Sequence, residues 1–201
     1  MNPSTLAQAR NAGGNMYSEH KAAQMCAFFL SKEGGKMSHL KLMKLLYLAD
    51  RESYRRHGYG VSGDAMVSMP HGPVLSQTLD HINGHIQSAP GGWDDWIADK
   101  ADHQVQLKKK NITRRDLGEM SACDMEVLAA VWKKFGRMDR WAISDYTHKH
   151  CAEWEDPNGS SNPIPREKIL QAVGYSKKHA KEIAAMRREE EAIDSLLQRP
   201  A

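Results

Sequence analysis

Two histidines are the first residues in this chain whose types and spacing suggest chemistry. His81 and His85 stand four residues apart, a spacing that brings two imidazoles to one face of a helix, where they could bind a metal ion. The glutamate that acts as general base in zinc proteases is missing from the segment between them. We therefore expect both histidines to face solvent beside an apolar stripe.

A second group of metal-ligand types lies near the end of a predicted helix. It comprises Asp145, His148, His150 and Cys151. Neighbouring residues at a helix end rarely all point to one centre, so we expect no metal there. Cys26 and Cys123 have no CxxC spacing and no basic neighbours, which argues against a zinc ribbon, a disulfide framework and a reactive thiolate. We predict neither a metal ion nor any other cofactor.

Motifs for nucleotide binding and acyl transfer are misplaced or missing. Residues 58–63 match G-x-G-x-x-G, and Asp80 follows at the distance of a ribose-binding acid. This glycine motif, however, joins a predicted helix to a predicted strand, whereas a nucleotide fingerprint follows a strand and opens a helix. The chain also has no G-x-S-x-G elbow and no Walker glycine loop. We therefore predict a connecting loop at 58–63 and a protein that is not an enzyme.

The composition is that of an ordinary globular protein. Of its 201 residues, 40% are hydrophobic, and 28 Lys and Arg oppose 25 Asp and Glu, for a net charge of +3. This balance argues against a protein that coats nucleic acid. No stretch approaches the ~18 apolar residues of a membrane helix, and residues 1–15 lack the features of a secretory leader. We expect a cytoplasmic protein with no membrane association.

Hydrophobic periodicity predicts a mainly helical domain with one small sheet. The expected helices cover residues 18–33, 38–56, 73–88, 121–135, 139–148, 165–173 and 176–199. The alternating segments 64–69 and 105–107 are expected to pair as antiparallel strands. The predicted fold class is α+β: a predominantly α-helical single domain of about six to eight helices, a small antiparallel β-sheet and a long C-terminal helix.

Composition also suggests how the chain divides. Residues 1–17 are small and polar and are expected to form a flexible N-terminal arm, residues 18–174 a folded domain, and residues 175–201 a C-terminal helical extension. The extension has only a thin apolar stripe, so it needs either the core of this protein or a partner to cover it. A homo-oligomer formed through this helix is one of the alternatives.

Basic residues gather in two parts of the chain. The first group surrounds the second predicted helix and consists of Lys36, Lys41, Lys44, Arg51, Arg55 and Arg56. The second is the segment 108–115. Because two helices followed by a strand pair are the outline of a winged-helix DNA binder, DNA binding is one hypothesis. A solvated face and an electropositive surface for an acidic protein partner are the other two.

Four short blocks occur in an order that resembles a known family. They are K-L-M-K-L-L-Y at 41–47, G-D-A-M-V-S-M-P-H-G-P-V at 63–74, T-H at 147–148 followed by Trp154, and an isoleucine-led segment at 164–173. Together they resemble the Panacea antitoxin family, which includes SocA-like and GepA-like phage-associated proteins. The resemblance covers residues 18–174, which are therefore expected to form a Panacea-like domain. Asp50 departs from it, because a glutamine is common at that position.

The resemblance implies an antitoxin, a mainly helical domain with a small sheet that binds a cognate toxin encoded by a neighbouring gene and neutralises it. Direct protein–protein binding is the expected mode of neutralisation, and no catalysis is implied. Two alternatives stay open. One is a DNA-binding autoregulator that recognises operator DNA, and the other is an adaptor that delivers the toxin to an AAA+ protease.

The resemblance and the basic second helix together give a set of candidate partner-binding residues. These are Lys41, Lys44, Tyr47, Arg51, Met69, His71, His148 and Trp154. Tyr47 and His148 are the least explained by packing, because each has an apolar body and a polar tip. The helix after Tyr175 lies beyond the shared domain and is a further place where partner choice could reside.

Overall fold

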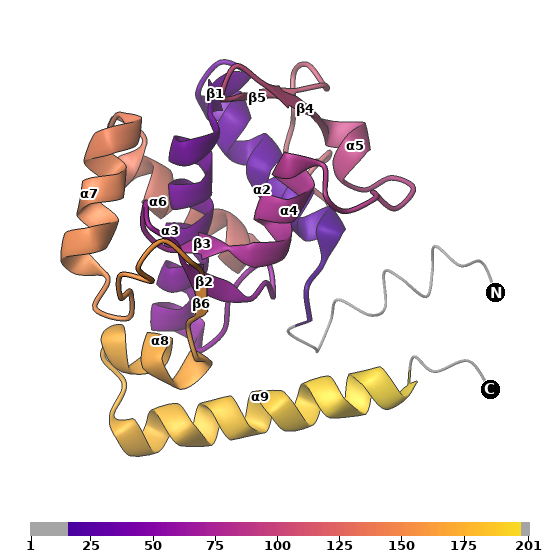
Figure 1. Ribbon diagram of the computed structural model, residues 1–201. Helices are drawn as coiled ribbons and strands as arrows, with labels where there is room; N and C mark the ends of the chain where they lie inside the picture. The colour runs from indigo at the N-terminus through magenta and orange to yellow at the C-terminus, as the bar shows by residue number, and fades with distance from the viewer. Residues whose placement is uncertain (1–15, 198–201) are drawn as a thin grey trace.

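The computed structural model of the protein describes residues 16–197. This part of the chain has eight α-helices, and six short strands form two three-stranded antiparallel sheets (Figure 1). The fold is α+β and mostly helical, and it ends in a long C-terminal helix, so the predicted fold class is confirmed. The expected N-terminal arm, residues 1–17, lies almost entirely outside the described residues.

Helix α3 (His39–His57) is the centre of the core. It contacts α2 (Glu19–Lys32), α6 (Ala122–Phe135), α7 (Arg140–His150) and α8 (Arg166–Ala172). Residues 41–50 of α3 are all buried, so this helix is apolar or enclosed around most of its circumference. Gly58 ends the helix in the left-handed conformation, with φ of 80°.

Side-chain caps fix the first turns of α2 and α6. At α2, the Ser18 side chain accepts a hydrogen bond from the backbone N–H of Lys21. At α6, Ser121 and Asp124 form a capping box, in which each side chain accepts a bond from the other residue's backbone. Helix α7 forms an outer layer at the left of Figure 1 and is capped by Asp139.

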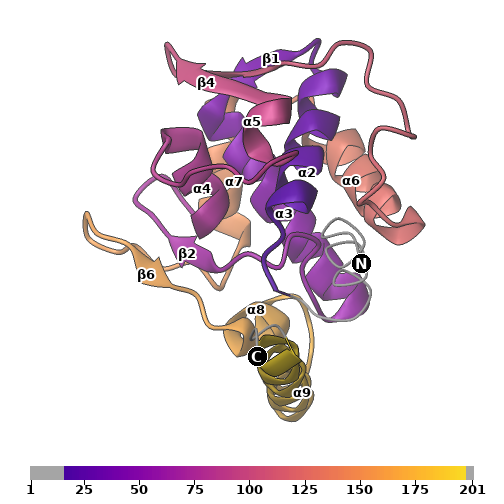
Figure 2. The same ribbon diagram turned by 90° about the vertical axis from the view of Figure 1, so that its right-hand side faces the viewer.

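The two segments expected to pair with each other lie in different sheets, so that prediction was wrong. Strand β2 (Met66–Ser68) pairs with β3 (Val74–Leu75) and β6 (Asn162–Pro163). Strand β5 (Gln104–Leu107) pairs with β1 (Lys36–Ser38) and β4 (Ile97–Ala101). The true partner strands are only two to five residues long, too short to show an alternating pattern. Figures 1 and 2 show the β1-β5-β4 sheet at the top of the molecule and the other sheet lower down.

The helix after Gly72-Pro73 is shorter than predicted. Residues 74–75 form strand β3, and α4 spans only Ser76–Asn83 before Gly84 ends it in the left-handed conformation. Ile86 therefore lies outside the helix and is exposed rather than part of an apolar stripe. The short helix α5 (Trp93–Trp96) follows.

The prediction for the histidine pair was half wrong. His85 is exposed as expected, but His81 is buried. The His81 ring stacks on Trp93, with ring centroids 5.4 Å apart, and lies 6.1 Å from the Tyr17 ring. The aromatic contacts that cover His81 come from segments distant in sequence, and the helical pattern around it carries no sign of them.

The glycine-rich segment 58–63 runs from α3 to β2, so the predicted connecting loop is confirmed. Asp50 fixes this loop to α3, because its buried carboxyl group accepts hydrogen bonds from the N–H groups of Val61 and Ser62 and from the Ser62 hydroxyl. Burial raises the pKa of Asp50 to about 7. A Cβ at position 60 would lie 2.8 Å from an Asp50 oxygen, so this close approach requires glycine.

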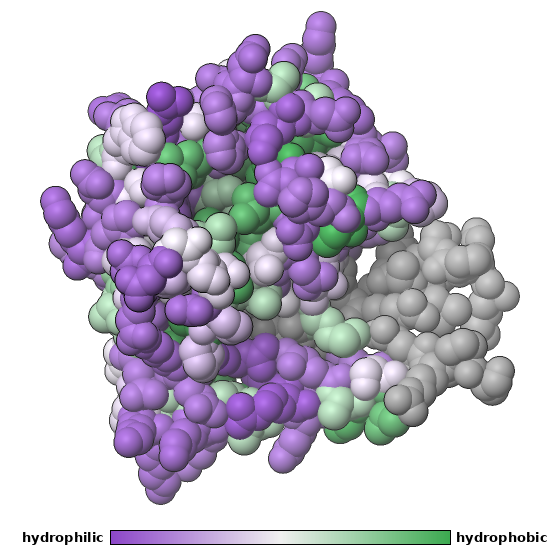
Figure 3. Space-filling view, in the orientation of Figure 1, coloured by the Kyte–Doolittle hydropathy of each residue, from purple (hydrophilic) through white to green (hydrophobic). Residues whose placement is uncertain are grey.

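Helix α9 (Lys177–Leu197) runs along α8 at the lower edge of the molecule (Figures 1 and 2). Its first half packs through the fully buried Ala180 and Ala184. Its second half exposes Ile193, Leu196 and Leu197, and Figure 3 shows hydrophobic residues at this end of the helix. The predicted end of the helix at residue 199 lies outside the described residues. A homo-oligomer through α9 and the division at residues 174–175 stay predictions.

Candidate partner-binding surface

Seven of the eight candidate residues come together where α3 meets the loop before β3 and the loop after α7. We call this group, with Glu153, the α3 junction: Lys44, Tyr47, Arg51, Met69, His71, His148, Glu153 and Trp154. Lys41 lies apart from it, where its ammonium group pairs with Glu33 at 2.8 Å and donates to the Gly136 carbonyl. Three of the four sequence blocks thus converge in space although up to about 110 residues separate them in the chain.

Glu153 connects α3 to the loop after α7. Its carboxylate accepts a hydrogen bond from the Tyr47 hydroxyl and forms an ion pair with Arg51, whose Nε lies 2.6 Å from Oε1. The Glu153 side chain is fully buried, so Arg51 supplies the charge that balances it. Burial raises the pKa of Tyr47. Burial alone would lower the pKa of Arg51, but the bond and charge of Glu153 raise it.

Lys44 is fully buried under the turn that leads into β3. Its Nζ donates to the Pro73 carbonyl at 2.8 Å, and burial lowers its pKa to about 7. Gly72 has φ of 93°, and a Cβ there would lie 2.6 Å from Thr147 Oγ1 and 2.9 Å from Lys44 Nζ. The G-P-V block therefore needs its glycine both for backbone conformation and for the close approach of this turn to Lys44 on α3 and Thr147 on α7.

Trp154 ties the loop after α7 to the segment before β3. Its indole N–H donates to the Met69 carbonyl at 3.0 Å, and its ring stacks on His148 with centroids 4.3 Å apart. The Nε2 atom of His148 is buried and has no hydrogen-bond partner within residues 16–197. Burial lowers the pKa of His148, and the nearby Lys44 charge lowers it further. His148 thus has a packing contact with Trp154 that the sequence did not predict.

An exposed tryptophan lies at the edge of the junction. Trp141, in the first turn of α7, is 56% exposed. Its ring meets the His71 ring edge-on at 6.4 Å, and the Arg140 guanidinium lies 5.2 Å from its centroid. A cavity of about 350 Å³ opens beside it. We call the residues around this cavity the Trp141 surface: Ser38, His39, Leu40, His71, His103, Arg140 and Trp141.

The Trp141 surface combines aromatic groups with polar atoms that do not form all of their possible hydrogen bonds. The His39 and His103 rings stack at 5.7 Å, and burial lowers the pKa of His39. The Ser38 hydroxyl is buried with no hydrogen-bond partner in the described chain. Exposed Trp and Arg beside groups that can still form hydrogen bonds are typical of residues that contribute most to protein–protein binding.

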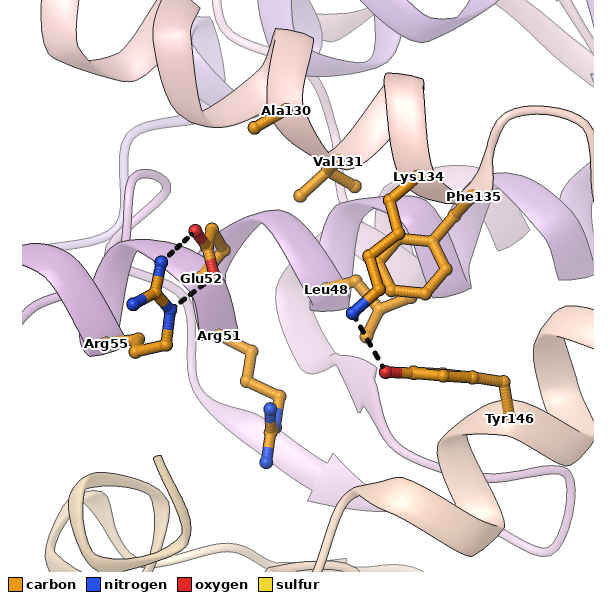
Figure 4. Close-up of a pocket in the computed structure, with 9 residues that line it drawn as sticks. All are labelled: Leu48, Arg51, Glu52, Arg55, Ala130, Val131, Lys134, Phe135 and Tyr146. Atoms are coloured by element: carbon orange, nitrogen blue, oxygen red, sulfur yellow. Dashed lines mark hydrogen bonds and ion pairs between the residues drawn. The ribbon is translucent and has the colours of Figure 1, made fainter. Parts of the chain in front are cut away.

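A second cleft of about 350 Å³ lies between α3, α6 and α7 (Figure 4). We call it the α3–α6–α7 cleft. Leu48, Val131 and Phe135 form its apolar floor. Its polar lining consists of Arg51, Glu52, Arg55, Lys134 and Tyr146.

The family model described as "Antitoxin SocA-like, Panacea domain" matches residues 42–155, more than half of the chain. The chain belongs to this family. The matched segment of the Panacea domain contains the whole α3 junction, the whole α3–α6–α7 cleft and most of the Trp141 surface. Comparisons with curated proteins and with solved structures found no match.

The basic residues around α3 do not form an open basic face in this Panacea protein. Lys44 is buried, and Arg51 pairs with the buried Glu153. Arg55 and Arg56 both pair with Glu52 at 2.6 Å. Helix α3 is also enclosed by four other helices, a position that suits the core of a domain better than a DNA groove.

Residues 16–197 contain no group of three or more His, Cys, Asp or Glu side chains placed to hold a metal ion. Within the same range, no helix combines the length and the apolar character needed to cross a bilayer.

The candidate residues differ in how accessible they are. Lys44 and Tyr47 have no exposed surface, whereas His71 is exposed and Arg51 and Trp154 are partly so. A partner that binds without opening the domain can reach only the accessible ones. The candidate set stays a prediction, and the structure adds Trp141 to it. The signal for Trp141 was present in the sequence, because Trp141 is out of phase with the buried Ile143 and Thr147 of α7.

Proposed function

We propose that this Panacea-domain protein is an antitoxin that binds the toxin encoded beside it and neutralises it by covering a surface the toxin needs. Family membership supports the antitoxin role. The observation that carries the binding surface is the 56% exposure of Trp141 between Arg140 and His71. Tryptophan and arginine are the residues most often found at the centre of protein interfaces.

Hydrogen bonds fix the backbone around Trp141 and His71, which favours binding of a partner there. Asp139 accepts bonds from the N–H groups of Trp141 and Ala142, which fixes the start of α7. The Ser144 hydroxyl donates to the His71 carbonyl at 2.9 Å, which fixes the turn carrying His71 against α7. Side chains held in place before binding lose little conformational entropy when a partner arrives.

The three cysteines are free thiols, which agrees with the reducing cytoplasm that we propose as the location of this protein.

The test is co-expression with the product of each adjacent reading frame. We expect one product to stop growth alone, to be harmless with this chain and to co-purify with it. Trp141→Ala should weaken that complex about 30-fold or more, because truncation of a central interface tryptophan costs about 2 kcal/mol or more. Lys178→Ala, an exposed change on α9 outside both surfaces, is the control and should have little effect. Failure of every neighbouring product to co-purify or to be neutralised would refute the proposal.

The same experiment separates the two alternative activities. A protease adaptor would shorten the lifetime of the toxin in cells, whereas an occluding antitoxin leaves it stable. An autoregulator would retard operator DNA, and this retardation would weaken steeply with salt. We expect a stable toxin, and we expect no retardation of DNA because the cations of α3 are mostly buried or already paired with carboxylates.

A further inference from the structure

The α3–α6–α7 cleft contains donors whose hydrogen-bonding capacity is not used up (Figure 4). Lys134 has no carboxylate within ion-pair distance in the described chain. Its Nζ instead donates to the Tyr146 hydroxyl oxygen at 3.3 Å and lies 5.0 Å from the centre of the Phe135 ring. Since the Tyr146 oxygen accepts that bond, the Tyr146 hydrogen is left to donate to a ligand. Both groups are accessible to solvent, so a bound acceptor would replace water at Lys134 and Tyr146.

The charges that line the cleft are predominantly positive. Of the lining cations, Arg51 is balanced by the buried Glu153 and Arg55 shares Glu52 with Arg56, whereas Lys134 has no carboxylate partner within residues 16–197. Glu52 is already occupied by Arg55 and Arg56, and the hydrogen bond from Arg55, the largest effect, helps lower its pKa to about 2. The carboxylate is therefore ionised and satisfied, and it does not neutralise Lys134. A ligand with negative charge would complement this cleft.

The floor of the cleft restricts what the negative group can be attached to. Leu48, Val131 and Phe135 line the same cleft with apolar surface, and Figure 4 shows Leu48 and Phe135 next to Lys134. A volume of about 350 Å³ accepts a few side chains but no long run of phosphates. The occupant that fits combines a carboxylate with a neighbouring apolar side chain, as an acidic peptide segment does.

The exposed surface of α7 relates this cleft to the Trp141 surface. With about 3.6 residues per turn, Ala142, Asp145 and Lys149 share one face of the helix, and all three are exposed. Trp141 lies to one side of that ridge and Tyr146 to the other. A protein that grips α7 along the ridge therefore reaches both surfaces.

We propose that the α3–α6–α7 cleft binds an acidic segment of the toxin, with a carboxylate on Lys134 and Tyr146 and an apolar side chain on the floor. This proposal rests on the proposed function, because it takes the toxin as the partner. The chain's own undescribed ends do not supply the segment, since residues 1–15 and 198–201 contain no Asp or Glu. A second copy could offer the exposed Asp94 and Asp95 of α5, but that contact would be head-to-tail and would favour open chains over a closed dimer.

The test reverses the charge at Lys134 and measures the dissociation constant of the complex with the co-purifying neighbouring gene product. We expect Lys134→Glu to weaken binding about 10- to 100-fold, because it places a carboxylate opposite a carboxylate. Lys133→Glu is the matched control, with the same change on an exposed neighbour that does not line the cleft. Tyr146→Phe, which removes only the hydroxyl, should weaken binding about 3- to 10-fold. Thermal unfolding of each variant checks that the fold is retained.

The outcomes separate this inference from the proposed function. If Lys134→Glu binds the toxin as the parent does while Trp141→Ala does not, the cleft inference is wrong and the antitoxin proposal stands. If the parent protein binds no neighbouring product, both are wrong. The third outcome uses a 30-base-pair DNA duplex. If the parent protein binds this duplex and Lys134→Glu does not, the cleft binds nucleic acid and the inference is overturned.

Discussion

The α3 junction and the surfaces beside α7 both contain aromatic and charged residues, but these are mostly buried in the junction and accessible on the surfaces. In the junction, Glu153, Tyr47 and Lys44 are buried, and each has a partner within the domain. On the surfaces, Trp141 is exposed and Lys134 lacks a carboxylate partner within residues 16–197. The residues that identify the family are therefore mostly those that hold loops onto α3, whereas the groups available to a partner lie next to them. The predictions below test that division of roles.

The largest effect is expected inside the junction. Glu153→Ala leaves the Arg51 charge and the Tyr47 hydroxyl without their buried partner, which should lower the free energy of unfolding by about 3–5 kcal/mol. Urea unfolding measures this loss. Glu155→Ala is the control, because Glu155 pairs with Lys168 at the exposed surface and should matter by less than about 1 kcal/mol. Equal losses in the two variants would contradict a structural junction.

A pH-dependent effect is expected at Asp50. The pKa of about 7 in the folded protein lies above the ordinary value of 3.8, so the folded state holds this proton more tightly than the unfolded chain. The stability contributed by Asp50 is therefore complete below pH 4 and is lost as the pH rises to 7. Between pH 5 and pH 8 the loss should be about 3 kcal/mol.

Asp50→Asn removes this titration and keeps an acceptor for Val61 and Ser62. The variant should lack the part of the pH dependence that comes from Asp50, and unfolding of both proteins in urea at pH 5 and pH 8 measures the difference. Asp64, another buried carboxyl group with a raised pKa, is present in both proteins, and its charge contributes to the raised pKa of Asp50, so the difference reports Asp50 together with that coupling. Parallel pH profiles would contradict the prediction.

A smaller effect is expected at the turn above Lys44. Gly72→Ala combines strain at a φ of 93° with a Cβ that would crowd Thr147 and Lys44, and should cost about 2 kcal/mol or more. Gly159→Ala is the matched control. It has a similar φ of 85° but nothing within 4 Å, and should cost only the backbone strain of about 1 kcal/mol. The difference in melting temperature isolates the close approach, and identical shifts would rule it out.

The smallest effect on folding is expected at the exposed surface. Trp141→Ala should change the free energy of unfolding by less than about 0.5 kcal/mol, although it removes a large side chain. Trp154→Ala removes the same atoms from the junction and should cost about 3 kcal/mol. Chemical denaturation of this pair of variants compares the two regions directly. A large loss in Trp141→Ala would place Trp141 in the structural group instead.

Features set by short-range interactions could be predicted from the sequence. The capping box at Ser121, the glycine at the end of α3 and the apolar stripes involve residues within about four positions of each other. Strand pairing could not be predicted, because β1 and β5 are separated by more than sixty residues and are three and four residues long.

In the candidate site, too, the sequence predicts local features but not contacts between distant residues. The family-like blocks could be read along the chain, but Glu153 gave no signal, since its role depends on partners 102 and 106 residues away. The exposure of Trp141 differs from the role of Glu153, because it left a local signal on α7 itself. Only the phase of Trp141 on that helix could have indicated it.

Of the junction residues, Arg51 alone also lines the α3–α6–α7 cleft. The guanidinium that neutralises Glu153 thus forms part of the wall against which a ligand would rest. A change at Lys134 or Tyr146 can alter partner choice at little cost to folding, whereas a change at Arg51 alters both. Any ligand that attracts Arg51 away from Glu153 would loosen the loop after α7, and by thermodynamic reciprocity a looser loop would favour that ligand.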